Sequence, residues 1–177
     1  QFFGAGDEPN VKRTLGISLL IGLTGSLLFV ISARLTPVGV MGIFTPSPET
    51  KAIGAAYLAI ACISYPFTAV STIYVSLLRS VNRVKIAVAS SVMAICVNVS
   101  LNYILIFGKL GMPAMGVKGA ALATLIARVM EAAVILCYTY FGRTELAANG
   151  KELLSFNRPF LKKYADTTLP VIANEFM

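Results

Sequence analysis

Histidine is absent from this sequence, and charged side chains are scarce. The first absence excludes catalysis by histidine and the usual zinc sites, which depend on imidazole ligands. Asp, Glu, Lys and Arg together make up only 13% of the chain, whereas about a quarter of the residues of a soluble domain are charged. So little charge cannot cover the surface of a water-soluble globule of 177 residues.

Cysteine is also rare, and the three residues, Cys62, Cys96 and Cys137, fall in different apolar stretches. An odd number without a recognisable pairing or ligand spacing favours small hydrophobes in helices over disulfides or metal ligands. The sequence also shows no recognisable nucleophile geometry, phosphate-binding loop or metal-ligand cluster. We therefore predict that the protein is not an enzyme, that it binds no metal and that it has no cofactor.

Four long apolar runs fill most of the chain, at residues 15–33, 52–78, 86–107 and 115–141. An α-helix needs about 20 residues to cross a hydrocarbon core about 30 Å thick. It also satisfies its own backbone hydrogen bonds, which the interior of a bilayer demands. The predicted fold class is therefore all-α, a polytopic transmembrane helix bundle, and the lipid bilayer is its first expected partner.

Lysine and arginine are distributed unequally between the segments that separate these runs. Ten lie before the first run, between the second and third, or after the fourth, and three lie in the alternate loops. Because basic loops stay on the cytoplasmic side, this asymmetry orients the spans. The formal net charge of +7 is then explained by an anionic inner leaflet and does not predict a nucleic-acid partner.

Proline and glycine predict where the helices end or bend. Pro37 interrupts the first span, Pro66 bends the second, and residues 108–113 form a tight outer turn. Ser47 or Thr50 is expected to cap the second span.

Small residues near the start of the fourth span, Gly116, Ala120, Ala123 and Thr124, have a spacing that lets another helix approach closely.

Polar groups inside the spans are candidate functional residues, because burying them in a bilayer is costly. Asn98 and Asn102 lie four residues apart, which places both amides on one helical face. They are suited either to coordinating a cation or binding a substrate, or to hydrogen bonding between helices. We include Thr124 with them as a candidate residue of the ion or substrate pathway.

Ionisable residues supply the remaining candidates. Arg128 and Glu131 are three residues apart and are predicted to form an ion pair, with a protonatable relay as the alternative. Arg34 is expected to reach the membrane interface. Glu175, five residues after Pro170, is a carboxylate that can bind and release H⁺ or Na⁺.

Three segments, residues 78–83, 98–108 and 111–124, resemble sequences of the multidrug and toxic compound extrusion (MATE) transporters. The resemblance extends in order over nearly the whole chain. Residues 1–7 are similar to the end of the second helix of the family, the four spans to helices three to six, and Leu169-Pro170 to the start of helix seven.

That resemblance implies a protein of two six-helix lobes, of which this chain is a fragment. Residues 1–141 would form part of the N-terminal lobe, residues 142–162 a cytoplasmic linker, and residues 163–177 the first helix of the next lobe. It further implies export of small cationic, amphipathic compounds across the plasma membrane in exchange for H⁺ or Na⁺. The missing second lobe of the same chain would then be a partner.

The resemblance also assigns residues. Asn98 matches an asparagine of an Asn-x-x-x-Asp pattern found in some members, and Asn102 stands where those members have aspartate. Glu175 is a candidate for the acid of helix seven. Two other functions keep the same architecture: a lipid-linked saccharide flippase of the same superfamily, whose cavity would be richer in cationic residues, and a membrane scaffold without transport.

Overall fold

The structure is a computed structural model that describes residues 7–142, 147, 153, 160, 161, 164–166 and 168. The helix end predicted at residues 1–7, the linker at 142–162 and the segment 163–177 therefore lie almost entirely outside the described residues. The elements in chain order are α1 (Glu8–Leu35), α2 (Pro37–Phe44), α3 (Pro48–Ala61), a 3₁₀ turn η1 (Cys62–Ser64), α4 (Tyr65–Ser80), α5 (Val84–Phe107) and α6 (Val117–Phe141).

Four stretches of the described chain are long and apolar enough to cross a membrane: Pro9–Leu35, Pro48–Ser80, Val84–Phe107 and Val117–Phe141. They confirm the four predicted spans and the all-α fold class. Their outer surfaces remain apolar, since large side chains such as Leu28 (62% exposed), Ile95 (62%) and Val99 (61%) point away from the bundle. An outward apolar surface is what a helix bundle presents to lipid.

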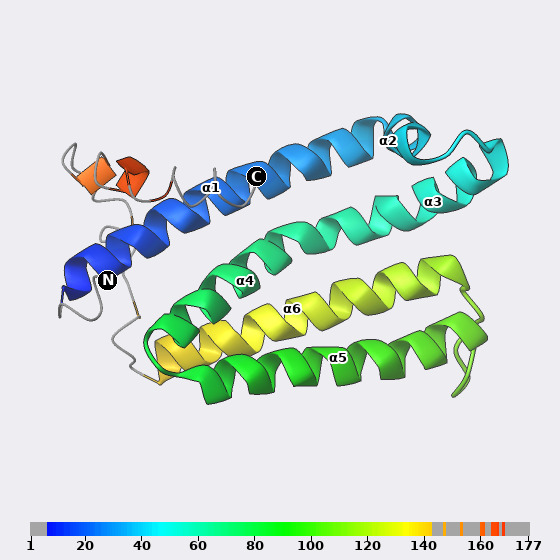
Figure 1. Ribbon diagram of the computed structural model, residues 1–177. Coiled ribbons are helices and arrows are strands. Elements are labelled where there is room, and N and C mark those ends of the chain that lie inside the picture. Colours follow the sequence, from blue (N-terminus) through cyan, green and yellow to red (C-terminus); the bar gives the residue numbers. More distant parts are fainter. Residues whose placement is uncertain are drawn as a thin grey trace.

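Successive spans run in opposite directions. The beginning of α1, the connection from α4 to α5 and the end of α6 lie together at the left of Figure 1. The described basic residues of that end are Lys12, Arg13, Arg79, Arg83 and Lys85, whereas Lys51, Lys109 and Lys118 lie at the opposite end. This arrangement agrees with the unequal distribution of charge in the sequence.

The helices begin and end close to the prolines and the capping serine that predicted their breaks. The first span ends at Leu35, and Pro37 begins α2 as a separate short helix. Ser47 is the N-cap of α3, and its side chain accepts a hydrogen bond from the backbone amide of Thr50. The second span is interrupted by the 3₁₀ turn η1, which ends two residues before Pro66.

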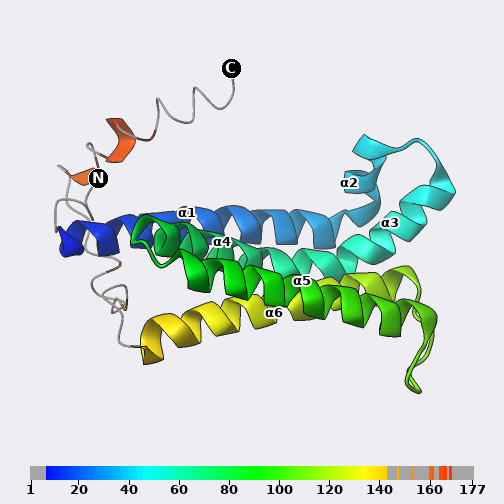
Figure 2. The same ribbon diagram turned by 60° about the horizontal axis from the view of Figure 1, so that its bottom comes forward.

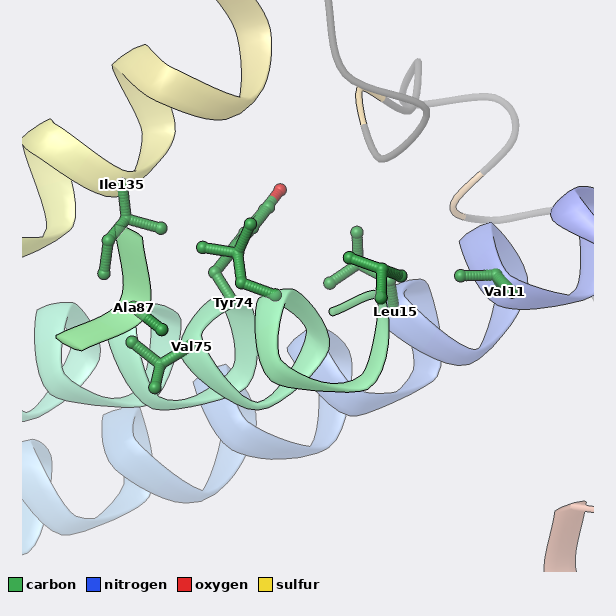
Figure 3. Close-up of a cluster of buried hydrophobic side chains, with 8 residues drawn as sticks. Val11, Leu15, Tyr74, Val75, Ala87 and Ile135 are labelled. Atoms are coloured by element: carbon green, nitrogen blue, oxygen red, sulfur yellow. The ribbon is translucent and has the colours of Figure 1, made fainter. Parts of the chain in front are cut away.

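Helix α6 lies against α3, α4 and α5, while α1 packs mainly on α4 and α2 packs on α3 (Figures 1 and 2). The largest buried cluster gathers side chains from α1, α4, α5 and α6 near the basic end (Figure 3). Leu15, Tyr74, Leu78 and Ile135 are each at most 2% exposed. This cluster therefore packs the α1–α4 pair of helices against the α5–α6 pair.

The contact between α5 and α6 is close at Gly119, a residue that the predicted set of small residues did not include. A Cβ atom on Gly119 would lie 2.7 Å from the carbonyl oxygen of Leu105. Gly116 precedes the helix as its N-cap, and Ala120 and Thr124 are only half-buried. The prediction of close approach is correct: Ala123 is buried, and Thr124 contacts Asn98 on α5.

Candidate functional site

Polar side chains of α5 contact polar side chains of α6 in two places. We refer to the polar residues that take part, together with those bonded to them, as the polar seam: Ser91, Asn98, Asn102, Thr124, Arg128 and Glu131. Asn98 on α5 contacts Thr124 on α6, and Ser91 on α5 contacts Glu131 on α6. Seven residues separate the two contacts on each helix, which is about two turns of an α-helix. Because the helices are antiparallel, equal spacing in opposite directions keeps both contacts in register.

The first contact is part of a chain of hydrogen bonds. The Nδ2 of Asn102 donates to the Oδ1 of Asn98 at 3.0 Å, and the Nδ2 of Asn98 donates to the Oγ1 of Thr124 at 3.3 Å. Thr124 in turn donates to the carbonyl oxygen of Ala120 at 3.0 Å. The two asparagines therefore share one face of α5, as their spacing predicted.

One polar atom of this chain has no partner within the described structure: the Oδ1 of Asn102 is buried and accepts no hydrogen bond. An amide oxygen left unpaired in a low-dielectric environment is costly. It is an acceptor suited to a hydrogen-bond donor or a cation. The asparagine pair thus presents a buried oxygen that is available to bind a ligand.

The second contact holds a buried carboxylate. Glu131 is 3% exposed, and its Oε2 accepts a hydrogen bond from the Nη1 of Arg128 at 2.8 Å. Its Oε1 accepts a hydrogen bond from the Oγ of Ser91 at 3.0 Å. The predicted Arg128–Glu131 ion pair is confirmed, and both carboxylate oxygens are occupied.

Sequence reasoning missed Ser91. A serine inside an apolar helix gives a weak signal, because its hydroxyl is easily satisfied by a carbonyl of its own helix. The available clue is that Ser91 lies seven residues before Asn98, and so on nearly the same face of α5.

A cavity of about 250 Å³ opens beside the polar seam. Its lining consists of Ala94, Ile95, Asn98, Thr124, Ala127 and Arg128. The small side chains of the two alanines make room for the cavity. The amide of Asn98, the hydroxyl of Thr124 and the guanidinium of Arg128 supply its polar surface. Asn102 and Glu131 do not line the cavity. Asn102 is hydrogen-bonded to Asn98, and Glu131 to Arg128, and both of these partners do line it.

The remaining candidates lie elsewhere. Arg34 is exposed, and its Nη1 donates to the carbonyl oxygen of Ala59 at 3.1 Å, so it joins α1 to α3. That it reaches the membrane interface stays a prediction. Glu175 lies outside the described residues. Within the described part of the chain, no group of three or more Cys, Asp or Glu side chains is placed to hold a metal ion.

Comparison with known proteins finds a matching family and several similar sequences. The profile of the MatE family matches residues 1–104. A probable multidrug resistance protein NorM from Photorhabdus laumondii is 38% identical over 138 residues, which cover 75% of this chain and 29% of that protein. The corresponding protein of Thermotoga maritima is 31% identical over 147 residues, covering 80% of this chain and 30% of the relative.

A probable NorM protein from Neisseria meningitidis is 32% identical over 129 residues, covering 71% of this chain and 27% of that protein. The chain thus spans less than a third of the length of these relatives. No solved structure gives a significant match.

Proposed function

The chain belongs to the MatE family, and we propose that it forms part of a secondary active transporter for multidrug efflux. The transporter exports small cationic, amphipathic compounds in exchange for H⁺ or Na⁺ by alternating access, and it performs no chemical reaction on them. Relatives that carry the name multidrug resistance protein support this proposal. The four apolar helices make the protein a multi-pass membrane protein, and we propose the plasma membrane as its location.

One observation carries the proposal: the asparagine pair has a buried oxygen without a partner, on Asn102, and its other member, Asn98, lines a cavity between two spans. If the pair served only to hold the helices together, each amide oxygen would have a donor, as the Oδ1 of Asn98 has in the Nδ2 of Asn102. The free Oδ1 of Asn102 instead favours a ligand that completes the pair. A coupling cation or a donor group of the substrate has the required chemistry.

The charge of the cavity also favours a cationic substrate. Arg128 supplies its only cationic side chain among the described lining residues, and Glu131 neutralises that charge. A cation entering the cavity therefore meets amide and hydroxyl oxygens without a net positive field. A saccharide flippase would hold anionic phosphates and needs a more strongly basic lining, so the antiporter is the better supported alternative.

Replacing the asparagine pair tests the proposal in the full-length gene product. Asn98→Ala with Asn102→Ala is expected to lower ion-driven export of a cationic dye by about tenfold, since each hydrogen bond to a ligand contributes on the order of 1 kcal/mol. Export is measured in proteoliposomes with Na⁺ and pH gradients imposed separately. The gradient whose removal abolishes transport identifies the coupling ion.

Ser100→Ala is the matched control, because Ser100 is an exposed polar residue of the same helix. It should leave both export and membrane abundance unchanged. Normal export by the double asparagine variant, at wild-type abundance, would disprove the role of the pair. A parallel loss of abundance and export would instead show that the pair only stabilises the helix contact.

A further inference from the structure

A second polar cavity lies at the basic end of the bundle, where α4 turns into α5. Its volume is about 660 Å³, and it is lined by Asn82, Arg83, Val84, Lys85, Ile86 and Tyr138. The second span ends at Ser80 and the third begins at Val84. The cavity therefore lies at the boundary between the apolar spans and the membrane surface, where lipid headgroups lie.

The backbone of this turn is held firmly. Only residues 81–83 connect the two helices, and the amide of Arg83 donates to the carbonyl oxygen of Leu78 at 2.7 Å. Asn82 adopts a left-handed conformation with φ of 61°. Leu78 and Val81 are buried in the main apolar cluster. The turn consequently presents Arg83 and Lys85 from a fixed position.

Between residues 7 and 142, no acidic side chain neutralises the positive charge of this cavity. The sequence has no Asp or Glu between residues 50 and 130. Within residues 7–142, neither Arg83 nor Lys85 forms an ion pair, in contrast with Arg128. The Nη1 of Arg83 donates only to the hydroxyl of Tyr138, at 3.5 Å. Most of the donors of the guanidinium are therefore available to an anion.

Apolar side chains adjoin the charged ones. Val84 and Val88 on α5 are 43% and 47% exposed, and Phe141, one turn beyond Tyr138 on α6, is 86% exposed. A ligand that fits this surface combines an anionic group with long apolar chains. A free anion would use the charges alone and leave the apolar surface uncovered.

We propose that this cavity binds the phosphate of an anionic phospholipid. Arg83 and Lys85 hold the phosphate oxygens, the hydroxyl of Tyr138 donates a further hydrogen bond, and the acyl chains run along Val84 and Val88. Clusters of basic residues at the cytoplasmic ends of spans are suited to such headgroups. The site is separate from the polar seam and does not depend on the proposed transport.

Lipid binding by the purified full-length gene product tests this site. Phosphatidylglycerol and phosphatidylcholine are titrated separately, and bound lipid is counted by native mass spectrometry. Wild-type protein should retain phosphatidylglycerol in preference to phosphatidylcholine. Arg83→Gln with Lys85→Gln should weaken phosphatidylglycerol binding by about tenfold or more, because each cation near the surface contributes to the attraction.

Lys109→Gln with Lys118→Gln is the matched control, because it removes the same charge from two exposed residues at the opposite end of the bundle. It should bind phosphatidylglycerol as the wild type does. Equal binding of phosphatidylglycerol by the Arg83/Lys85 variant, or equal binding of both lipids by the wild type, would overturn the proposal. Displacement of the lipid by inorganic phosphate would also overturn it and identify a site for small anions.

Lys85→Gln alone provides a second test if the double variant does not fold. Lys85 is exposed, so its replacement removes one cation without disturbing the core. Binding of phosphatidylglycerol should then weaken by about threefold to tenfold. An unchanged affinity in this variant would count against the site.

Discussion

The contact between α1 and α4 and the contact between α5 and α6 use polar side chains in different ways. At the first, Thr14, Ser26 and Thr68 each donate to a carbonyl oxygen of their own helix. The helices meet mainly through apolar side chains such as Leu15 and Tyr74. At the second, the polar seam pairs side chains between the helices.

This difference separates polar residues that a span tolerates from polar residues that define a site. A hydroxyl that donates to its own helix is satisfied locally and makes little demand on its neighbours. An amide or a carboxylate has more polar atoms than its own helix can satisfy, so it requires a partner from elsewhere. The polar seam meets that requirement for every group named above except the Oδ1 of Asn102.

The largest effect is expected from breaking the ion pair. Glu131→Leu leaves the guanidinium of Arg128 without its carboxylate, and removing one partner of a buried pair typically costs about 3 kcal/mol. Arg128 is 44% exposed on its side chain, so part of that cost is relieved by solvent or lipid headgroups. The free energy of unfolding in detergent and the yield of folded protein measure the loss.

Glu131→Leu combined with Arg128→Leu is the informative second variant. Replacing both charges with apolar groups should recover most of the lost stability, because no uncompensated charge remains. If the double variant is as unstable as Glu131→Leu alone, the loss comes from packing or from Ser91 and not from the unpaired cation.

Two glycine substitutions compare the same change at a tight and an open position. Gly119→Ala should lower the free energy of unfolding by about 2 kcal/mol, since its Cβ would lie 2.7 Å from the backbone oxygen of Leu105. Gly25→Ala on α1 meets nothing within 4 Å and should raise stability by up to about 1 kcal/mol through helix propensity. Thermal unfolding of the two variants measures whether each substitution lowers or raises stability. A loss of equal size at the two positions would contradict the close α5–α6 contact.

The smallest change in the free energy of unfolding is expected from replacing either of two matched threonines by valine. Thr68 and Thr124 both donate to a carbonyl of their own helix, but only Thr124 also accepts a hydrogen bond from Asn98. Thr124→Val should therefore cost about 0.6 kcal/mol, which is typical of a hydrogen bond between membrane helices. Thr68→Val should change the free energy of unfolding by less, and equal losses would indicate that the bond to Asn98 contributes nothing.

Part of the site follows from the sequence because its geometry is local. The spacing of Asn98 and Asn102, and that of Arg128 and Glu131, determines which side chains share a face of one helix. Both pairs form as predicted. The role of Ser91 was not predictable in this way, because it depends on which residue of α6 stands opposite to it.

The small-residue contact shows the same limit. Several faces of the fourth span carry Gly or Ala, so the sequence does not indicate which of them meets α5. The packing of α6 against α5 places Gly119 beside the backbone of Leu105 and Thr124 beside Asn98. A displacement of one residue along a helix turns the contact face by about 100°.

Hydropathy predicted the four spans, proline and glycine predicted their breaks, and lysine and arginine predicted the basic end. Each of these properties depends on a single stretch of chain and its solvent. The position of α5 against α6 is a different kind of property. It arises from contacts between residues far apart in sequence, and a small change in register would pair other side chains. The cavity beside Asn98, the burial of Glu131 and the free oxygen of Asn102 therefore exist only in the packed bundle.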